Sequence, residues 1–209
     1  MNDDAACPAG CRILIDPPSR ATAGLLATAF AEEPGIRWTC GPDRTRRHVW
    51  FAATERLIAG QPASRRYLLE RHGRPVGAAW VTRSVDRPAP TAQLRWLSRV
   101  LAGCGPAVVA RTAAYRRREN AYVPPAATIL EFVGVLEEAR GTRLGGALVR
   151  RVLDDALSGP DAAAVHLSTA DPCNVDIYRH LGFEVDGTFS LPGLRVTAMS
   201  LMPGSSTAP

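Results

Sequence analysis

The sequence predicts a single α/β (α+β) domain built around a mixed sheet, and three observations support this fold class. The chain has 209 residues, 46% of them hydrophobic, which is enough for one well-packed core. Apolar positions recur with the period of a helix in some segments and with period two in others, and the two kinds alternate along the chain. Glycine and proline turns separate the segments, and no internal repeat is visible.

The first half of the chain predicts a strand, two helices and a hairpin. Residues 11–15 (CRILI) form the strand. The first helix covers residues 19–33, with Ser19 as N-cap and Pro34 beyond its end, and the second covers residues 42–60. The period then changes to two, which predicts an antiparallel hairpin of residues 65–71 and 74–83 around a turn at His72 and Gly73.

The second half predicts a helical insert followed by alternating strands and helices. The insert covers residues 86–126, and the tails 1–10 and 203–209 are expected to be flexible, which leaves the domain at 11–202. The expected elements are helices at 90–103 and 106–120, a strand at 127–135, a helix at 141–157, a strand at 162–169, a helix at 173–181, and strands at 183–191 and 194–202.

The composition excludes several classes of protein. All 25 basic residues are arginine, so neither a Walker loop nor a Schiff-base lysine is possible. The five cysteines are scattered without a CxxC pair, so no disulfide framework and no metal is expected. The net charge of +5 comes from arginines interleaved with acids, which favours a solvated surface over nucleic-acid binding. Without a signal peptide or a long apolar stretch, we expect a cytoplasmic protein with no membrane partner.

A glycine-containing loop, Arg140-Gly-Thr-Arg-Leu-Gly-Gly146, follows the strand at 127–135 and opens the next helix. Free N–H groups at a helix start, with the positive end of the helix dipole behind them, suit a pyrophosphate. Glycines allow the backbone to come close to such a ligand. An ordinary turn between strand and helix, with glycines for packing, would give the same pattern. The loop by itself leaves both interpretations open.

A second motif, Asn174-x-x-x-Tyr178-x-x-x-Gly182-Phe183, follows at a suitable distance. With Val135, Arg140 and Gly145 of the loop, it resembles the signature of the GCN5-related N-acetyltransferases (GNAT) over about residues 129–186. Arg143 stands where this family usually has its middle glycine. Residues 27–47 and the insert at 86–126 also resemble puromycin N-acetyltransferase and its actinobacterial relatives.

The resemblance implies a single GNAT domain and a cosubstrate. Its sheet would be mixed and mostly antiparallel, flanked by helices, with central strands at 129–135 and 163–169 that splay. The cosubstrate would be acetyl-CoA, whose pantetheine arm would lie between these strands. The residues implied for its binding are Val133, Val135, Arg140, Gly141, Thr142, Arg143, Leu144, Gly145, Gly146 and Asn174. Asn174 has a second interpretation, as a cap of its helix.

In such enzymes an amine attacks the thioester directly, so a base and an acid for the leaving thiolate are needed. Tyr178 is the candidate acid, and packing under the Gly182–Phe183 turn is its alternative role. Glu131 is the ionisable residue of the 127–135 strand, and strict alternation would put it on the face of Val133 and Val135. Related enzymes carry a glutamate here as base, often acting through water; the alternative is an ion pair or a sheet edge. His166 is expected to be a satisfied core residue.

The acceptor pocket is expected to come from the first two helices and the insert. Its candidate residues are Phe30, Glu33, Trp38 and Ser168. Glu33, with Glu32, would bind a cationic amine or would merely be solvated. The sequence thus predicts acetyl-CoA-dependent transfer to the primary amine of a small molecule, an antibiotic or a biosynthetic intermediate. The alternatives are a protein or peptide acetyltransferase and a non-catalytic acyl-CoA sensor, and we expect a monomer or a homodimer.

Overall fold

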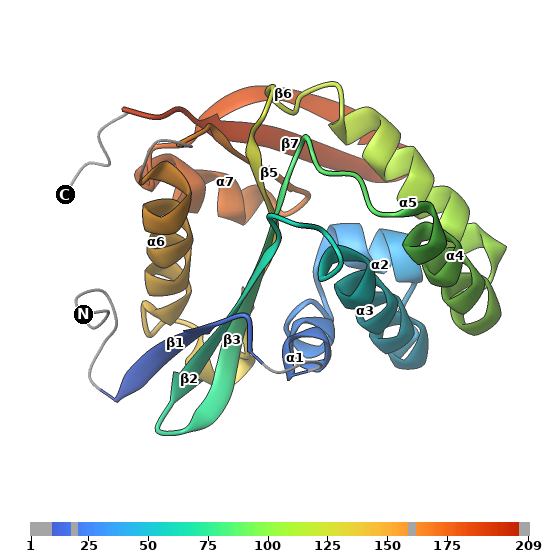
Figure 1. Cartoon of the computed structure of the whole chain (residues 1–209), viewed down its shortest axis with the longest axis horizontal. Helices are drawn as coiled ribbons and strands as arrows, with labels where there is room; N and C mark the ends of the chain where they lie inside the picture. The colour runs from blue at the N-terminus through green and yellow to red at the C-terminus, as the bar shows by residue number, and fades with distance from the viewer. Residues whose placement is uncertain (1–9, 18–20, 159–161, 205–209) are drawn as a thin grey trace.

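The strand segments assemble into one sheet with the order β1-β2-β3-β4-β5-β7-β6 in the computed structural model, which describes residues 10–17, 21–158 and 162–204 (Figure 1). Neighbouring strands are antiparallel except for β4 and β5, which are parallel. The strands are β1 (Cys11–Ile15), β2 (Arg65–Arg71), β3 (Arg74–Arg83), β4 (Thr128–Val135), β5 (Val165–Thr169), β6 (Glu184–Leu191) and β7 (Leu194–Leu201). The predicted mixed, mostly antiparallel sheet is confirmed.

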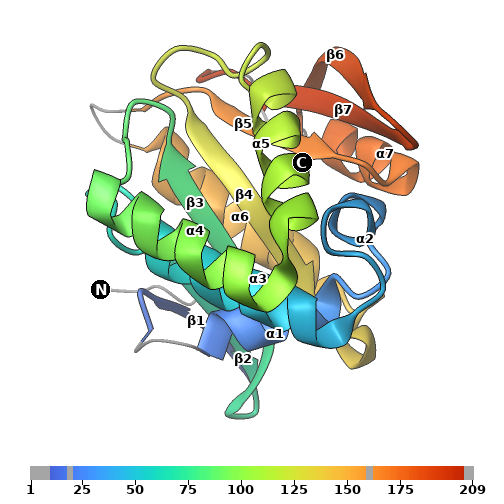
Figure 2. The same ribbon diagram turned by 90° about the vertical axis from the view of Figure 1, so that its right-hand side faces the viewer.

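Helices cover both faces of this sheet. One face carries α6 and α7, and the other carries α1 to α5, with α4 and α5 as the outer layer (Figures 1 and 2). The helices are α1 (Ala21–Ala29), α2 (Pro34–Cys40), α3 (Arg44–Ile58), α4 (Pro90–Cys104), α5 (Pro106–Glu119), α6 (Leu144–Leu157) and α7 (Pro172–His180), with a short 3-10 turn, η1 (Glu137–Ala139), before α6.

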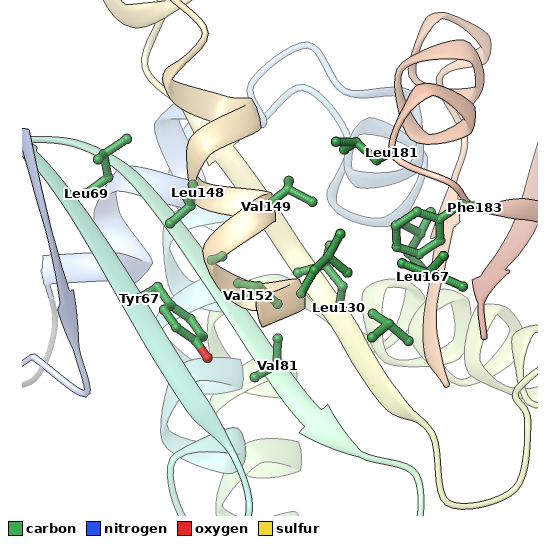
Figure 3. Close-up of a cluster of buried hydrophobic side chains, with 14 of the residues drawn as sticks. Tyr67, Leu69, Val81, Leu130, Leu148, Val149, Val152, Leu167, Leu181 and Phe183 are labelled. Atoms are coloured by element: carbon green, nitrogen blue, oxygen red, sulfur yellow. The ribbon is translucent and has the colours of Figure 1, made fainter. Parts of the chain in front are cut away.

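Each face has its own hydrophobic core, as the alternation of apolar side chains along the strands requires. Between the sheet and α6, Leu148, Val149 and Val152 point toward side chains of the strands, among them Leu130 and Leu167 (Figure 3). On the other face an aromatic cluster packs against α1 and α3. Its rings belong to Phe30, Trp50, Phe51, Trp80 and Phe132.

The segment after α1 differs from the prediction. The first helix was expected to run through residue 33, with Pro34 beyond its end, but α1 ends at Ala29 and Pro34 begins the separate helix α2. Proline is tolerated in the first turn of a helix, where its missing N–H is not needed. The Glu33 carboxylate caps this helix by accepting a hydrogen bond from Ile36 N at 2.6 Å. The predicted N-cap Ser19 and most of both predicted flexible tails lie outside the described residues.

The central strands β4 and β5 pair only at their beginnings. Thr128 faces Val165 and Ile129 faces His166, and no further ladder pairs of these two strands occur in the described chain. Beyond this point the strands diverge, as expected of splayed central strands. The main-chain groups of the following residues on β4 are therefore free on the β5 side.

A β-bulge interrupts β4 next to this split. Trp80 of β3 pairs with Phe132 and Val81 pairs with Leu130, so Glu131 is an extra residue without a partner. Leu130 and Val133 belong to the core under α6, whereas Glu131 bonds to groups on the opposite side. The prediction that Glu131 shares a face with Val133 and Val135 is therefore wrong, because the bulge shifts the alternation by one residue.

Candidate active site

A pocket opens on the sheet face that α2, α3 and α5 cover. It encloses about 620 Å³ of empty space, part of it open to solvent. Its lining residues are Phe30, Glu33, Gly35, Ile36, Thr39, Trp50, Thr112, Tyr115, Arg116, Glu119, Leu130, Glu131, Phe132 and Ser168. Three helices (α2, α3 and α5) and two strands (β4 and β5) thus contribute to one cavity, and α5 brings the predicted insert into it.

One cation and two carboxylates form the polar floor of the pocket. Arg116 donates from Nη1 to Glu119 Oε2 at 2.9 Å and from Nη2 to Glu131 Oε2. Thr82 Oγ1 donates to the other oxygen of Glu131 at 2.8 Å. The side chains of Glu119 and Glu131 are 7% and 8% exposed, whereas that of Arg116 is 37% exposed. Glu131 therefore has the ion pair that was one of its two expected roles.

Burial dominates the electrostatics of Glu119. Desolvation raises the pKa of its carboxyl, and the nearby charge of Arg116 lowers it only in part. Ser168 of β5 is close enough to lower this pKa further, yet its buried Oγ makes no hydrogen bond of ordinary geometry. The predicted pocket residue Ser168 thus lies at the pocket with hydrogen-bonding capacity left over.

His166, two residues earlier on β5, is only half satisfied. Its Nδ1 lies 3.0 Å from Ser200 Oγ, and Ser200 donates to Asp186 Oδ2 at 2.6 Å. Its Nε2 is buried and has no partner among the described residues. Burial lowers the pKa of the imidazole, which favours the neutral ring. The expectation of a fully satisfied core histidine is therefore wrong for this nitrogen.

Glu33 is the third carboxylate of the pocket. Its carboxylate accepts a hydrogen bond from the main-chain N–H of Ile36, and no arginine in the described part of the chain lies within 4.0 Å of it. Burial raises the pKa of Glu33, and the charge of Asp171 adds to this effect. Its neighbour Glu32 is exposed and pairs with Arg37 instead.

Tyr178 lies on α7, the helix that follows β5. Its half-buried ring packs against Phe183 with 5.6 Å between ring centroids, as the packing interpretation expects. Burial raises the pKa of the phenol, and the charge of Glu33 raises it further. Tyr178 and Glu33 therefore influence each other electrostatically. The role of Tyr178 as an acid stays a prediction.

The loop before α6 has the geometry of an anion-binding turn. Gly141 and Arg143 have φ values of +73° and +63°, in the left-handed region. No side chain caps the start of α6, so its first N–H groups are not taken by the chain's own carboxylates or hydroxyls. A Cβ on Gly141 would meet nothing within 4 Å. These features are suited to a pyrophosphate, and the residues expected to hold it stay a prediction.

Other predicted cofactor residues have structural partners. Arg140 donates to Ala29 O at 3.1 Å, at the end of α1, and Thr142 Oγ1 donates to Ala139 O at 2.6 Å. Asn174 Nδ2 lies 3.4 Å from Thr169 Oγ1. The cap of α7 is Asp171, whose carboxylate accepts from Cys173 N at 3.0 Å, so capping by Asn174 is excluded.

Phe30 and Trp38, both expected at the acceptor pocket, differ in position. Phe30 lines the pocket and packs so closely on β4 that a Cβ on Gly134 would lie 2.8 Å from its ring. Trp38 is not among the lining residues. Its Nε1 donates to Pro192 O at 2.8 Å, and Arg111 lies 5.9 Å from its ring centre. Trp38 thus joins α2 to the turn between β6 and β7.

Sequence reasoning missed Arg116 and Glu119. They belong to the stretch YRRREN, whose arginines are among those that the sequence predicts to form a solvated surface, and Arg117 and Arg118 are indeed exposed. The available signal was helical spacing, since Thr112, Tyr115, Arg116 and Glu119 recur at intervals of three and four and share one side of α5. Glu119 follows Arg116 by three residues within this pattern, and this spacing indicates the ion pair between them.

Comparison with known proteins gives consistent matches over most of the chain. A family model described as "Acetyltransferase (GNAT) family" matches residues 29–183. A Corynebacterium glutamicum structure described as histone acetyltransferase HPA2 and related acetyltransferase is 25% identical, with a TM-score of 0.67, covering 95% of this chain and 99% of that one.

Two further solved structures share the fold. A GNAT family acetyltransferase from Elizabethkingia anophelis with acetyl-CoA bound is 10% identical, with a TM-score of 0.52 and coverage of 93% and 99%. A ribosomal-protein-alanine N-acetyltransferase from Brucella melitensis is 18% identical, with a TM-score of 0.52 and coverage of 90% and 99%. In the described residues no three His, Cys, Asp or Glu side chains gather as a metal site would need, and no helix is long and apolar enough to cross a bilayer.

Proposed function

The chain belongs to the acetyltransferase (GNAT) family and is an acyltransferase, and we propose that it moves the acetyl group of acetyl-CoA to the primary amine of a small molecule. The observation that carries this proposal is the pocket itself. Three carboxylates, Glu33, Glu119 and Glu131, line it together with one cation, Arg116, and several aromatic side chains. Such a pocket favours a cationic amine with an apolar body.

Two observations support acetyl-CoA as the acetyl donor. The Elizabethkingia structure of the same fold has acetyl-CoA bound. In this chain, the uncapped start of α6 would accept the pyrophosphate, and the free edges of the split between β4 and β5 would accept the amide groups of the pantetheine arm. The thioester would then lie between Tyr178 and the pocket.

The proposed reaction is direct transfer. The neutral amine attacks the thioester carbonyl carbon, a new C–N bond forms and the C–S bond breaks. A pocket carboxylate takes the proton that the amine loses, and the Tyr178 hydroxyl gives a proton to the leaving thiolate. Glu131 was the expected base and Glu33 an expected binder of the cation; both line the pocket.

The names of two similar proteins bear on the nature of the acceptor. The Corynebacterium and Brucella proteins are described by names that refer to protein acceptors, which makes a protein N-acetyltransferase the second candidate. An acceptor on a protein chain suits a shallow groove, whereas the carboxylates of this pocket are buried. The similarity of residues 27–47 and of the insert to puromycin N-acetyltransferase further favours an antibiotic or a biosynthetic intermediate.

The first experiment is the release of free coenzyme A thiol from acetyl-CoA across a panel of amines. The panel contains puromycin, aminoglycosides, amino acids, polyamines and basic peptides. We expect rapid release with a small amine and none with peptides. Release with peptides alone would favour the protein acetyltransferase, and binding of acetyl-CoA without release by any amine would favour the sensor.

The role of Tyr178 is tested by Tyr178→Phe, with Tyr122→Phe as the matched control outside the pocket. Loss of the acid should lower kcat by about 100-fold or more. The affinity for acetyl-CoA should stay within about twofold, because the ring still packs on Phe183. Unchanged kcat in Tyr178→Phe would assign the residue to packing alone.

A further inference from the structure

We infer that Glu33, at the start of α2, is the general base of the acetyl transfer, and that Glu131 instead anchors Arg116 in the floor of the pocket. The inference rests on the proposed function, because it names the proton acceptor of that reaction. It assigns to Glu33 a chemical step where the sequence predicted only binding of the amine.

The partners of Glu131 make it a poor proton acceptor. One of its oxygens accepts from Thr82 and the other from Arg116, and the side chain is 8% exposed. A base must offer a lone pair to the substrate N–H, and each oxygen of Glu131 already accepts a hydrogen bond, one of them from a cation. Protonation of Glu131 would leave Arg116 with Glu119 as its remaining partner.

Glu33 lacks these restraints. Its one hydrogen bond among the described residues comes from the main-chain N–H of Ile36, and no arginine of the described chain pairs with it. Its position is also suitable. A Cβ built on Gly35 would lie 3.2 and 3.3 Å from the two Glu33 oxygens and 3.4 Å from the Cβ of Ala170. Glu33 and Ala170 therefore flank the same space beside Gly35, and Ala170 lies between β5 and the helix that carries Tyr178.

The electrostatic relation between Glu33 and Tyr178 fits an acid and base pair. Burial raises the pKa of Glu33, which brings it nearer to that of an amine donor. The negative charge of Glu33 raises the pKa of Tyr178. When Glu33 takes the proton of the attacking amine, that charge disappears and the phenol becomes a better donor. The proton for the thiolate is thus released more easily once the amine has been deprotonated.

The decisive test compares Glu33→Gln with Glu131→Gln in transfer to the amine found active in the thiol assay. We expect Glu33→Gln to lower kcat by about 100-fold or more and to remove the acidic limb of the pH–rate profile. Glu131→Gln should keep that limb. Glutamine can still cap α2, and an unchanged Kd for acetyl-CoA in both variants would show that the fold is retained. A full acidic limb in Glu33→Gln, or its loss in Glu131→Gln, would overturn the inference.

A second readout needs no acceptor. In a carbon-13 NMR titration of the glutamate carboxyls, with the Glu33 signal assigned by its absence in Glu33→Gln, Glu33 should titrate above its ordinary value of 4.5. Titration at or below 4.5 would contradict the assignment of Glu33 as base. If no amine supports thiol release while Glu33 titrates as expected, the proposed function fails separately from the electrostatics of Glu33.

Discussion

Two regions meet where β4 and β5 separate, and the chain builds them in different ways. The proposed cofactor side is nearly continuous in sequence, because the end of β4, the loop at 140–146 and α6 follow one another. The acceptor side combines residues from position 30 to position 168, carried by α2, α3, α5 and two strands. The first region offers main-chain groups and glycine conformations, and the second offers side chains. The comparison shows why a local motif identifies the first region and cannot identify the second.

The largest effect is expected on the acceptor side, from removal of its cation. Arg116→Met leaves Glu119 and Glu131 buried without a counter-charge, and breaking such a pair is strongly destabilising. Because Arg116 is partly exposed, we expect a loss of about 2–3 kcal/mol in the free energy of unfolding at neutral pH. Denaturant unfolding measures it, with Arg117→Met on the exposed side of α5 as control.

The pH dependence of Arg116→Met checks the cause. Without the arginine the pKa of the Glu119 carboxyl should rise further, so its protonation on acidification should relieve part of the loss. The double variant Arg116→Met with Glu119→Gln should recover part of the stability. A deficit that is constant with pH would indicate lost packing of the arginine stem instead.

On the cofactor side, the expected effect is smaller and of opposite sign. Arg143 has a φ of +63°, which a residue with a Cβ adopts at a cost. Arg143→Gly should therefore stabilise the fold by about 0.5–1 kcal/mol. If its guanidinium pairs with the pyrophosphate, the same change should weaken binding of coenzyme A. Thermal unfolding with and without coenzyme A separates the two effects.

The matched change at Gly141, two residues before Arg143, should have the opposite effect on the free energy of unfolding. Gly141→Ala keeps an open surrounding but forces a Cβ onto a φ of +73°, and about 1 kcal/mol should be lost. If Arg143→Gly and Gly141→Ala changed the free energy of unfolding equally and with the same sign, main-chain conformation would not be what sets this loop apart from the acceptor side.

The smallest change in Tm is expected from the substitution Glu33→Gln. The sign of this change distinguishes a carboxylate kept for function from one that stabilises the fold. Its pKa is raised above 4.5 in the folded state, so the folded protein binds this proton more tightly than the unfolded chain. Stability gained from Glu33 is thus present at low pH and lost as the pH rises through the raised pKa. Glu33→Gln should have a higher Tm than the wild type at neutral pH, and the difference should vanish toward about pH 4.5.

Glu32→Gln is the control for this measurement. Glu32 is exposed and paired with Arg37, so its change should not reproduce the pH-dependent gain in Tm. A lower Tm for Glu33→Gln at all pH values would mean that Glu33 contributes mainly as the cap of α2.

The sequence predicts strands and hairpins well where local periodicity decides them. The His72–Gly73 turn follows directly from residues that accept positive φ, here +50° and +74°. The α2 helix was missed because Pro34 stops one helix and starts another with equal ease. The face of Glu131 was wrong because a bulge is a pairing property of two strands and leaves no mark in one of them.

The candidate site likewise has one part that local sequence predicts and another that depends on contacts between distant segments. The loop at 140–146 and the residues of α7 follow from a motif, since their geometry is local. Arg116 and Glu119 become recognisable only when α5 is laid against β4, because their partner Glu131 is distant in the chain. The burial that raises the pKa of Glu33 is likewise produced by segments that no single stretch contains.

The contact between Phe30 and Gly134 has an evolutionary consequence. Most of the acceptor wall stands on helices outside the sheet, so substitutions in α2 or α5 can change the preferred amine while the strand that would hold the thioester stays intact. At Gly134 the acceptor wall and the strand depend on each other, because the Phe30 ring occupies the space that a side chain at Gly134 would need. Adaptation to a bulkier amine is therefore more accessible through α5, and a lineage that alters Phe30 must compensate along β4.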